Sequence, residues 1–309
     1  MKNHKLKLLG PSKDGTLHVP LATLIDVGSA LLEGARRAAR FEYEGESVRK
    51  GQRPTWLEQL CDIDVRELSY GSVEIHVDAP TLQGLPDFEV AELEDSQPTL
   101  SAIDRFALMM AAVCEDDGAN VLADRALLDI GARFARLAID HGYTGIEISG
   151  VHNRVDPLRV LPAHAGLFER LRDSTPLPRA VRLFAKLDQI SVTRNVVELR
   201  MEDQTLVHAT LDRGVHDPDM LHALFDANVV VSGVLHYTPS GAVRTLIVES
   251  IGEASSADKL FAELPPVATT MQLDLVSPQG PSTGVNAYFG TWPGDESDDQ
   301  LLRATRETA

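Results

Sequence analysis

The first 150 residues combine short strand-like runs with one long stretch of helical spacing. Lys5 to Leu9 predicts a strand, and two alternating runs around Tyr70-Gly71-Ser72 predict a hairpin with one solvated face. Between them, apolar residues recur every three or four positions, which predicts a long amphipathic helix. Its apolar positions are Leu21, Leu24, Ile25, Leu31, Leu32, Ala35, Ala38 and Ala39.

Two more helical patterns follow an acidic linker at residues 83–97. The first has apolar positions at Leu100, Ile103, Phe106, Met110 and Val113, and the second at Leu122, Leu127, Ile130, Phe134, Leu137 and Ala138. Gly142 ends the second helix before a strand at residues 145–148. The order of strand, helix, two strands, helical hairpin and strand predicts an α+β domain over residues 1–150. Its layout resembles a split βαβ, ferredoxin-like sheet.

The remaining chain divides into three parts. Residues 151–179 are punctuated by proline around a short helix near Leu167 to Leu171 and predict a connector. Residues 180–252 contain three strand patterns, a helix at Pro218 to Phe225 and two more strand patterns, an order typical of a small OB-like β-barrel. Gly233 inside the fourth strand fits a barrel bend where a side chain would be in the way. Residues 253–309 predict an extended tail with a short terminal helix.

The tail concentrates features of an interaction element. Ser297 and Gln300 have the spacing of a capping box, and a helix this short needs a surface on which to dock. That surface belongs either to this chain or to another protein, with aromatic and leucine anchors supplying hot spots. The candidate partner-binding residues are Phe289, Trp292, Asp295, Glu296, Asp298, Asp299, Leu301 and Leu302.

Composition is that of a globular protein, with 43% hydrophobic and 24% charged residues. No apolar run reaches the length of a membrane helix, so we expect a cytoplasmic protein with no membrane contact. The net charge of −17 favours basic partners, including proteins that themselves bind nucleic acid. Cys61 and Cys114 are isolated and are interpreted as core residues.

No recognisable catalytic motif is present: the sequence lacks a phosphate-binding Gly-rich loop, a His-Glu-x-x-His motif, paired cysteines and a nucleophile elbow. We therefore predict a binding protein with no catalytic residues, no cofactor and no metal. The strongest enzyme alternative is the polar side of the predicted hairpin, which any half-exposed hairpin would also show. Its residues are Asp62, Asp64, Glu74, His76 and Asp78.

A second alternative is a nucleic-acid-associated factor. OB-like barrels bind single strands, although this one has few aromatic and basic residues. A basic helix face is the other candidate for phosphate contacts, with a solvated helix surface as the ordinary interpretation. Its residues are Arg36, Arg37, Arg40, Arg49, Lys50 and Arg53.

The stretch Trp292-Pro293-Gly294-Asp295-Glu296-Ser297-Asp298 resembles terminal segments of bacterial antitoxin-type proteins encoded beside PIN-domain ribonuclease toxins. The resemblance covers only this short stretch, and the rest of the chain resembles uncharacterised bacterial proteins. It implies that Trp292 and the following helix lie over a toxin while acidic residues face its metal-dependent, RNA-binding cleft. The implied function is inhibition of a partner by occlusion; a bacterial defence system is the setting expected for the nucleic-acid-associated alternative.

Overall fold

The computed structural model describes residues 1–10, 19–49, 51–69, 73–84, 99–115, 121–191, 196–211 and 218–267. Residues 1–270 form one compact unit and residues 271–309 a second. The eight candidate partner-binding residues and the predicted terminal helix lie outside the described residues, as does Lys50. None of the described helices has both the length and the apolar character needed to cross a membrane.

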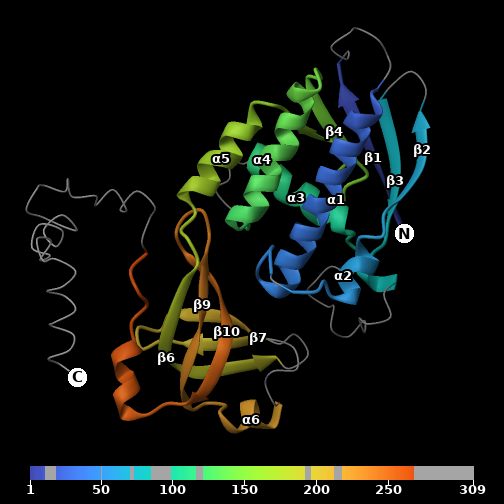
Figure 1. Ribbon diagram of the computed structural model, residues 1–309. Coiled ribbons are helices and arrows are strands. Elements are labelled where there is room, and N and C mark those ends of the chain that lie inside the picture. Colours follow the sequence, from blue (N-terminus) through green and yellow to red (C-terminus); the bar gives the residue numbers. More distant parts are fainter. Residues whose placement is uncertain are drawn as a thin grey trace, which may run out of the picture. The chain divides into compact units, whose positions relative to one another are not determined.

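The N-terminal half is built on a five-stranded sheet with the order β2-β3-β1-β4-β5 (Figure 1). The strands are β1 (Lys2–Leu9), β2 (Asp64–Ser69), β3 (Val73–Ala79), β4 (Gly145–Ser149) and β5 (Leu158–Val160). All neighbouring strands are antiparallel, and Leu6 of the central strand lies opposite Ile75 and Ile148. Alternation along β1 buries Leu6 and Leu8 on one face and directs Lys5 to the solvated face.

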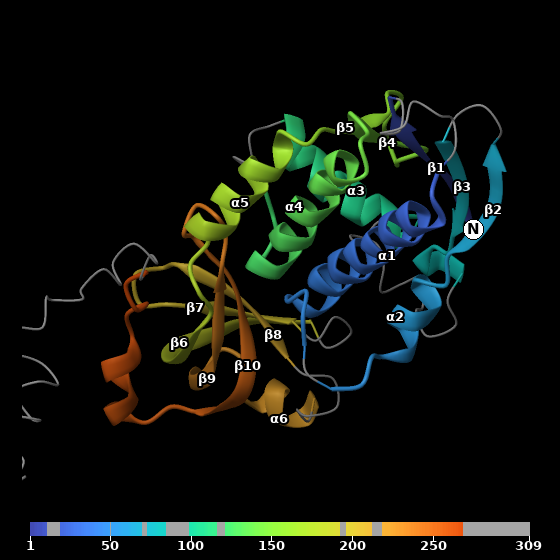
Figure 2. The same cartoon turned by 45° about the horizontal axis from the view of Figure 1, so that its top comes forward.

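Helices cover the apolar face of this sheet (Figure 2). They are α1 (Leu21–Glu44), α3 (Ala102–Glu115) and α4 (Arg125–Asp140), with the short α2 (Thr55–Leu60) and a 3₁₀ turn at Leu82–Gly84. The long amphipathic helix and the two later helices predicted from periodicity are thus confirmed. Phe106 of α3 packs edge to face on Phe134 of α4, with ring centres 5.5 Å apart. Its ring also lies against Gly34 of α1, where an added Cβ would come within 2.5 Å of it. The three helices therefore form one closely packed layer.

Residues 151–179 contain the short helix predicted near Leu167 to Leu171, which is α5 (His164–Ser174). They also supply the strand β5, which was not predicted. Leu158 and Val160 are fully buried at the sheet edge, and Phe168 packs where Gly131 of α4 leaves room. These apolar side chains find partners far away in sequence, which proline content alone does not reveal. The first core therefore extends to Phe168.

The second half contains a closed five-stranded barrel with the order β10-β8-β7-β6-β9. Its elements are β6 (Arg179–Ser191), β7 (Val196–Arg200), β8 (Leu206–Leu211), α6 (Pro218–Ala223), β9 (Asn228–Tyr237) and β10 (Val243–Glu253). Only the pairing of β8 with β10 is parallel. The chain is therefore mixed α+β with two sheets, and its barrel fits a small OB-like barrel.

Gly233 of β9 shows why the barrel can close. A Cβ added there would overlap the carbonyl oxygen of Ile247 on the neighbouring strand β10. The pairing of the two strands also shifts register between Val248 and Ser250, next to this glycine. The predicted need for a residue without a side chain at Gly233 is confirmed.

After β10 a 3₁₀ helix (Ser256–Phe261) follows, and Asp258 accepts a 2.8 Å hydrogen bond from Arg182 of β6.

Candidate functional site

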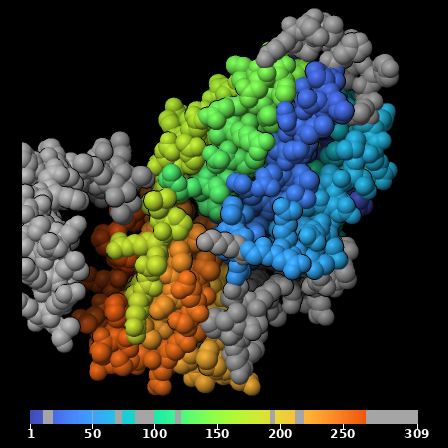
Figure 3. Space-filling model, viewed as in Figure 1, coloured from blue at the N-terminus to red at the C-terminus, as the bar shows by residue number. Residues whose placement is uncertain are grey.

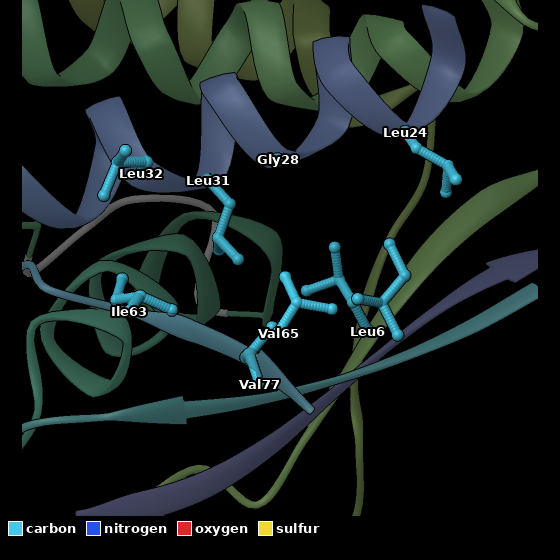
Figure 4. A pocket seen from close by; sticks show the side chains of 9 residues that line it. Leu6, Leu24, Gly28, Leu31, Leu32, Ile63, Val65 and Val77 are labelled. Carbon is cyan, nitrogen blue, oxygen red and sulfur yellow. The ribbon is translucent and has the colours of Figure 1, made fainter. Parts of the chain in front are cut away.

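An apolar pocket lies between α1 and the strands β1, β2 and β3. Its volume is about 370 Å³. Side chains point into it from both layers: Leu31 extends from the helix, and Leu6 and Val65 extend from the sheet (Figure 4). The lining residues are Leu6, Leu24, Gly28, Leu31, Leu32, Ile63, Val65, Ile75 and Val77.

The pocket has a buried floor and an exposed rim. Leu6, Leu31, Ile75 and Val77 are buried and belong to the main core. By contrast, Val65 on the edge strand β2 is 64% exposed. The pocket therefore runs from the surface down to the core between a helix and a sheet, which is where ligand sites commonly form.

Gly28 explains why the space is left open. It follows Leu24 by one helical turn on the same stripe of α1, where a larger apolar residue would ordinarily cover the sheet. A Cβ added at Gly28 has no neighbouring atom within 4 Å outside the adjacent backbone. Gly28 is itself exposed, so the missing side chain leaves the pocket open to solvent at this point of the helix.

The lining defines what this site can do chemically. Its side chains are aliphatic, and apart from backbone groups they offer no acid, base, nucleophile or hydrogen-bond donor. Such a site holds apolar groups and does not transfer protons.

The apolar surface continues outside the pocket, because Leu21 and Ile25 on successive turns of α1 are 71% and 57% exposed. Figure 3 shows α1, in blue, reaching the surface between α4 and the cyan β2–β3 segment.

The polar side of the β2–β3 hairpin, predicted as the enzyme alternative, is brought together only in part. Asp64 lies opposite Asp78, and His76 Nε2 is 3.9 Å from Glu74 Oε2. Asp78 is buried, where it accepts a 3.0 Å hydrogen bond from Asn3 Nδ2 and forms an ion pair with Arg66. Asp62 precedes the hairpin and is exposed. Among the described residues, no group of three or more His, Cys, Asp or Glu side chains could hold a metal ion.

A buried polar cluster under β1 was not anticipated from the sequence. Ser101 caps α3: its Oγ donates to Asp104 Oδ2 at 2.9 Å and accepts from the Asp104 N–H at 3.1 Å. His4 Nε2 is 2.9 Å from the same Ser101 Oγ, and Lys2 Nζ donates to Asp104 Oδ1 at 2.9 Å. The main-chain N–H of His152 also donates to Asp104 Oδ1, at 2.8 Å. The Ser-x-x-Asp spacing before the apolar run of α3 is the sequence signal that indicates this cap.

This Ser-His-Asp set has a structural role. Because Ser101 already donates its only hydroxyl proton to Asp104, His4 donates from Nε2. Its buried Nδ1 has no hydrogen-bond partner among the described residues, which fits the neutral Nε2–H tautomer. Burial lowers the pKa of His4 to about 4, in agreement with that neutral form. Burial raises the pKa of Asp104, but hydrogen bonds from Lys2 and Ser101 outweigh that effect and hold it below its usual value. In a catalytic triad the carboxylate orients the histidine; here Asp104 pairs with the serine and all three side chains are fully buried.

The predicted basic helix face is largely neutralised by local partners. Arg37 Nε donates to Glu33 Oε1 at 2.7 Å, and its Nη1 donates to the carbonyl of Ala126 at 2.8 Å. The buried Arg40 donates to Glu44 Oε2 at 2.7 Å, and Arg49 lies 3.7 Å from Glu46. Arg36 is half-buried and Arg53 is exposed. The structure therefore does not gather these arginines into one open phosphate-binding surface.

The sequence pattern alone correctly indicates both walls of the apolar pocket but not the space between them. The predicted helix stripe contains Leu24, Leu31 and Leu32, and the predicted hairpin contains Ile63 and Val65. Only their packing shows that Gly28 leaves a gap.

In comparisons with known proteins, no family model, no curated protein and no solved structure matches this chain.

Proposed function

We propose that this protein is a non-enzymatic binding protein. The observation that carries the proposal is the aliphatic pocket between α1 and the sheet, with its buried floor and exposed rim. Its lining can exclude water from an apolar group but offers no side chain for bond-making chemistry. Exposed Leu21 and Ile25 beside it add apolar surface of the kind that marks interaction sites.

We further propose that the C-terminal tail holds a partner protein, as an antitoxin-like or accessory subunit would. Support comes from the sequence: Trp292, Leu301 and Leu302 are apolar anchors, and acidic residues lie beside them. The net charge of −17 favours a basic partner such as an RNA-binding protein. A PIN-domain ribonuclease, inhibited by occlusion of its cleft, is the partner that the tail resemblance implies.

The experiment is a truncation after Phe289, tested by co-purification of the native partner. We expect the truncated chain to lose the partner while keeping its melting temperature, because residues 1–270 form a compact unit of their own. A chain with residues 290–309 in scrambled order preserves composition and charge and serves as the matched control. Loss of the partner in both variants supports a specific tail sequence. Retention of the partner by the truncated chain contradicts the proposal.

A nucleic-acid-associated factor is the second candidate, and the closed barrel is the observation that favours it. The pairing of Arg37 and Arg40 with carboxylates and backbone weighs against the basic helix face. Steeply salt-dependent binding of a single-stranded oligonucleotide would support this candidate, and absence of binding at low salt would remove it. Lys186→Glu on the barrel strand β6 should weaken such binding more than the control Arg159→Glu on the sheet of the N-terminal half.

Two finer predictions from the sequence are retained as proposals. The ferredoxin-like arrangement of the N-terminal domain is supported by the order β2-β3-β1-β4 and by its antiparallel pairing. One of the two described α-helices between β3 and β4 and the fifth strand β5 are additions to that arrangement. The cytoplasmic location stays a prediction.

A further inference from the structure

We propose that the pocket between α1 and strands β1–β3 binds an uncharged aliphatic chain. This inference rests on the proposed binding function and names the class of ligand for its site. It follows from three properties of the pocket: its lining, its dimensions and the missing side chain at Gly28.

The lining selects against charge. A charged group that entered would lose its hydration without gaining a side-chain partner, because the lining residues are leucine, isoleucine, valine and glycine. Water gains few hydrogen bonds there for the same reason, and enclosed cavities with such a lining accept hydrocarbons. No lining residue is aromatic, so a flat ring would find no ring on which to stack.

The dimensions suit a slim chain. A volume of about 370 Å³ lies in the lower range of small-molecule sites. Leu24 and Leu32 bound the pocket along α1, and eight residues at 1.5 Å per residue place them about 12 Å apart. A docking helix with a diameter of about 10–12 Å is too wide for a space of this volume. A hydrocarbon chain can follow the slot past Gly28 toward the floor at Leu6 and Val77.

The direct test titrates the purified full-length chain with straight-chain alcohols from hexan-1-ol to decan-1-ol. Methyl resonances of leucine, isoleucine and valine report the site by NMR. We expect saturable shifts centred on Leu6, Leu31, Ile75 and Val77, with affinity rising about fourfold per added methylene. Naphthalene, which has the same number of carbons as decan-1-ol, should bind more weakly than decan-1-ol.

A matched pair of glycine variants locates the binding. Gly28→Leu places a side chain at the mouth of the pocket and should weaken decan-1-ol binding at least tenfold. Gly166→Leu makes the same change on α5, where an added Cβ also meets nothing within 4 Å, and should leave binding unchanged. If Gly28→Leu lowers the melting temperature, Val65→Lys on the exposed rim replaces it and should also weaken binding.

Several results would overturn the inference. They are shifts that do not saturate, shifts centred outside the lining residues, equal binding by Gly28→Leu and wild type, and tighter binding of naphthalene. Sedimentation showing a dimer that Gly28→Leu dissociates would assign the pocket to a second copy of the chain instead. Repeating the titration on the chain truncated after Phe289 separates the two proposals, because alcohol binding should persist there whether or not the partner is lost.

Discussion

Arg244 of β10 lies over the ring of Phe41 near the end of α1, with its Cζ 3.2 Å from the ring centre. Its guanidinium also donates to the carbonyl oxygens of Phe41 at 3.2 Å and Gly45 at 2.7 Å. The Phe41 carbonyl also accepts the N–H of the C-cap residue Gly45 at 3.1 Å, so a barrel residue adds to the capping of the C-terminus of α1. Burial lowers the pKa of Arg244 to about 10, yet the side chain stays charged at neutral pH.

Replacing Arg244 should therefore destabilise the protein strongly. We expect Arg244→Ala to lower the free energy of unfolding by about 3 kcal/mol, because two charge-assisted hydrogen bonds and the ring contact are lost. Arg244→Lys should keep only part of the stability that Arg244→Ala loses, because the lysine ammonium lacks the planar set of donors of the guanidinium. Urea unfolding measures the free energy of unfolding of both variants. Arg159→Ala, which removes an exposed ion pair to Glu147, is the control and should cost less than about 1 kcal/mol. Equal effects of the two alanine variants would refute this role for Arg244.

Two glycines of α1 should respond oppositely to the same substitution. Gly34→Ala places a Cβ within 2.5 Å of the Phe106 ring and should destabilise the protein by about 1–3 kcal/mol through overpacking. Gly28→Ala meets open space and should stabilise it by up to about 1 kcal/mol through helix propensity. Thermal and urea unfolding of both variants provide the measurement. A stabilised Gly34→Ala would show that the helices are not packed as described.

Stability should depend on His4 in mildly acidic solution. The pKa of His4 is about 4 in the folded chain against 6.5 for an ordinary histidine, so between these values the unfolded chain binds a proton that the folded chain does not. Stability must then fall as pH drops from about 6.5 to about 4, by up to about 3 kcal/mol. Asp104, whose folded pKa is lowered from 3.8, loses its contribution only at still lower pH.

The variant His4→Gln isolates this effect, since it keeps a hydrogen-bond donor for Ser101 but cannot titrate. Urea unfolding of wild type and variant at intervals from pH 7 to pH 4 should give curves that converge as the pH falls. Parallel curves would mean that His4 is not a buried neutral residue.

The sequence by itself determined the local elements of this protein, because side-chain burial repeats with the period of the backbone. The stripe from Leu21 to Ala39 specified α1, the alternation around Tyr70 specified β2 and β3, and strand order specified the barrel. Gly233 could be assigned a steric role because a strand interior disfavours glycine without such a reason.

Only the tertiary structure decided which distant residues meet. His4 and Ser101 are 97 residues apart, and Arg244 and Phe41 are 203 apart, so no local period links them. Residues 158–168 joined the first core only because the sheet edge and Gly131 offered them a surface. The pocket beneath Gly28 depends in the same way on a helix and three strands packed around an absent side chain. A sequence pattern records which side chains are buried, whereas a cavity depends on how they fit together.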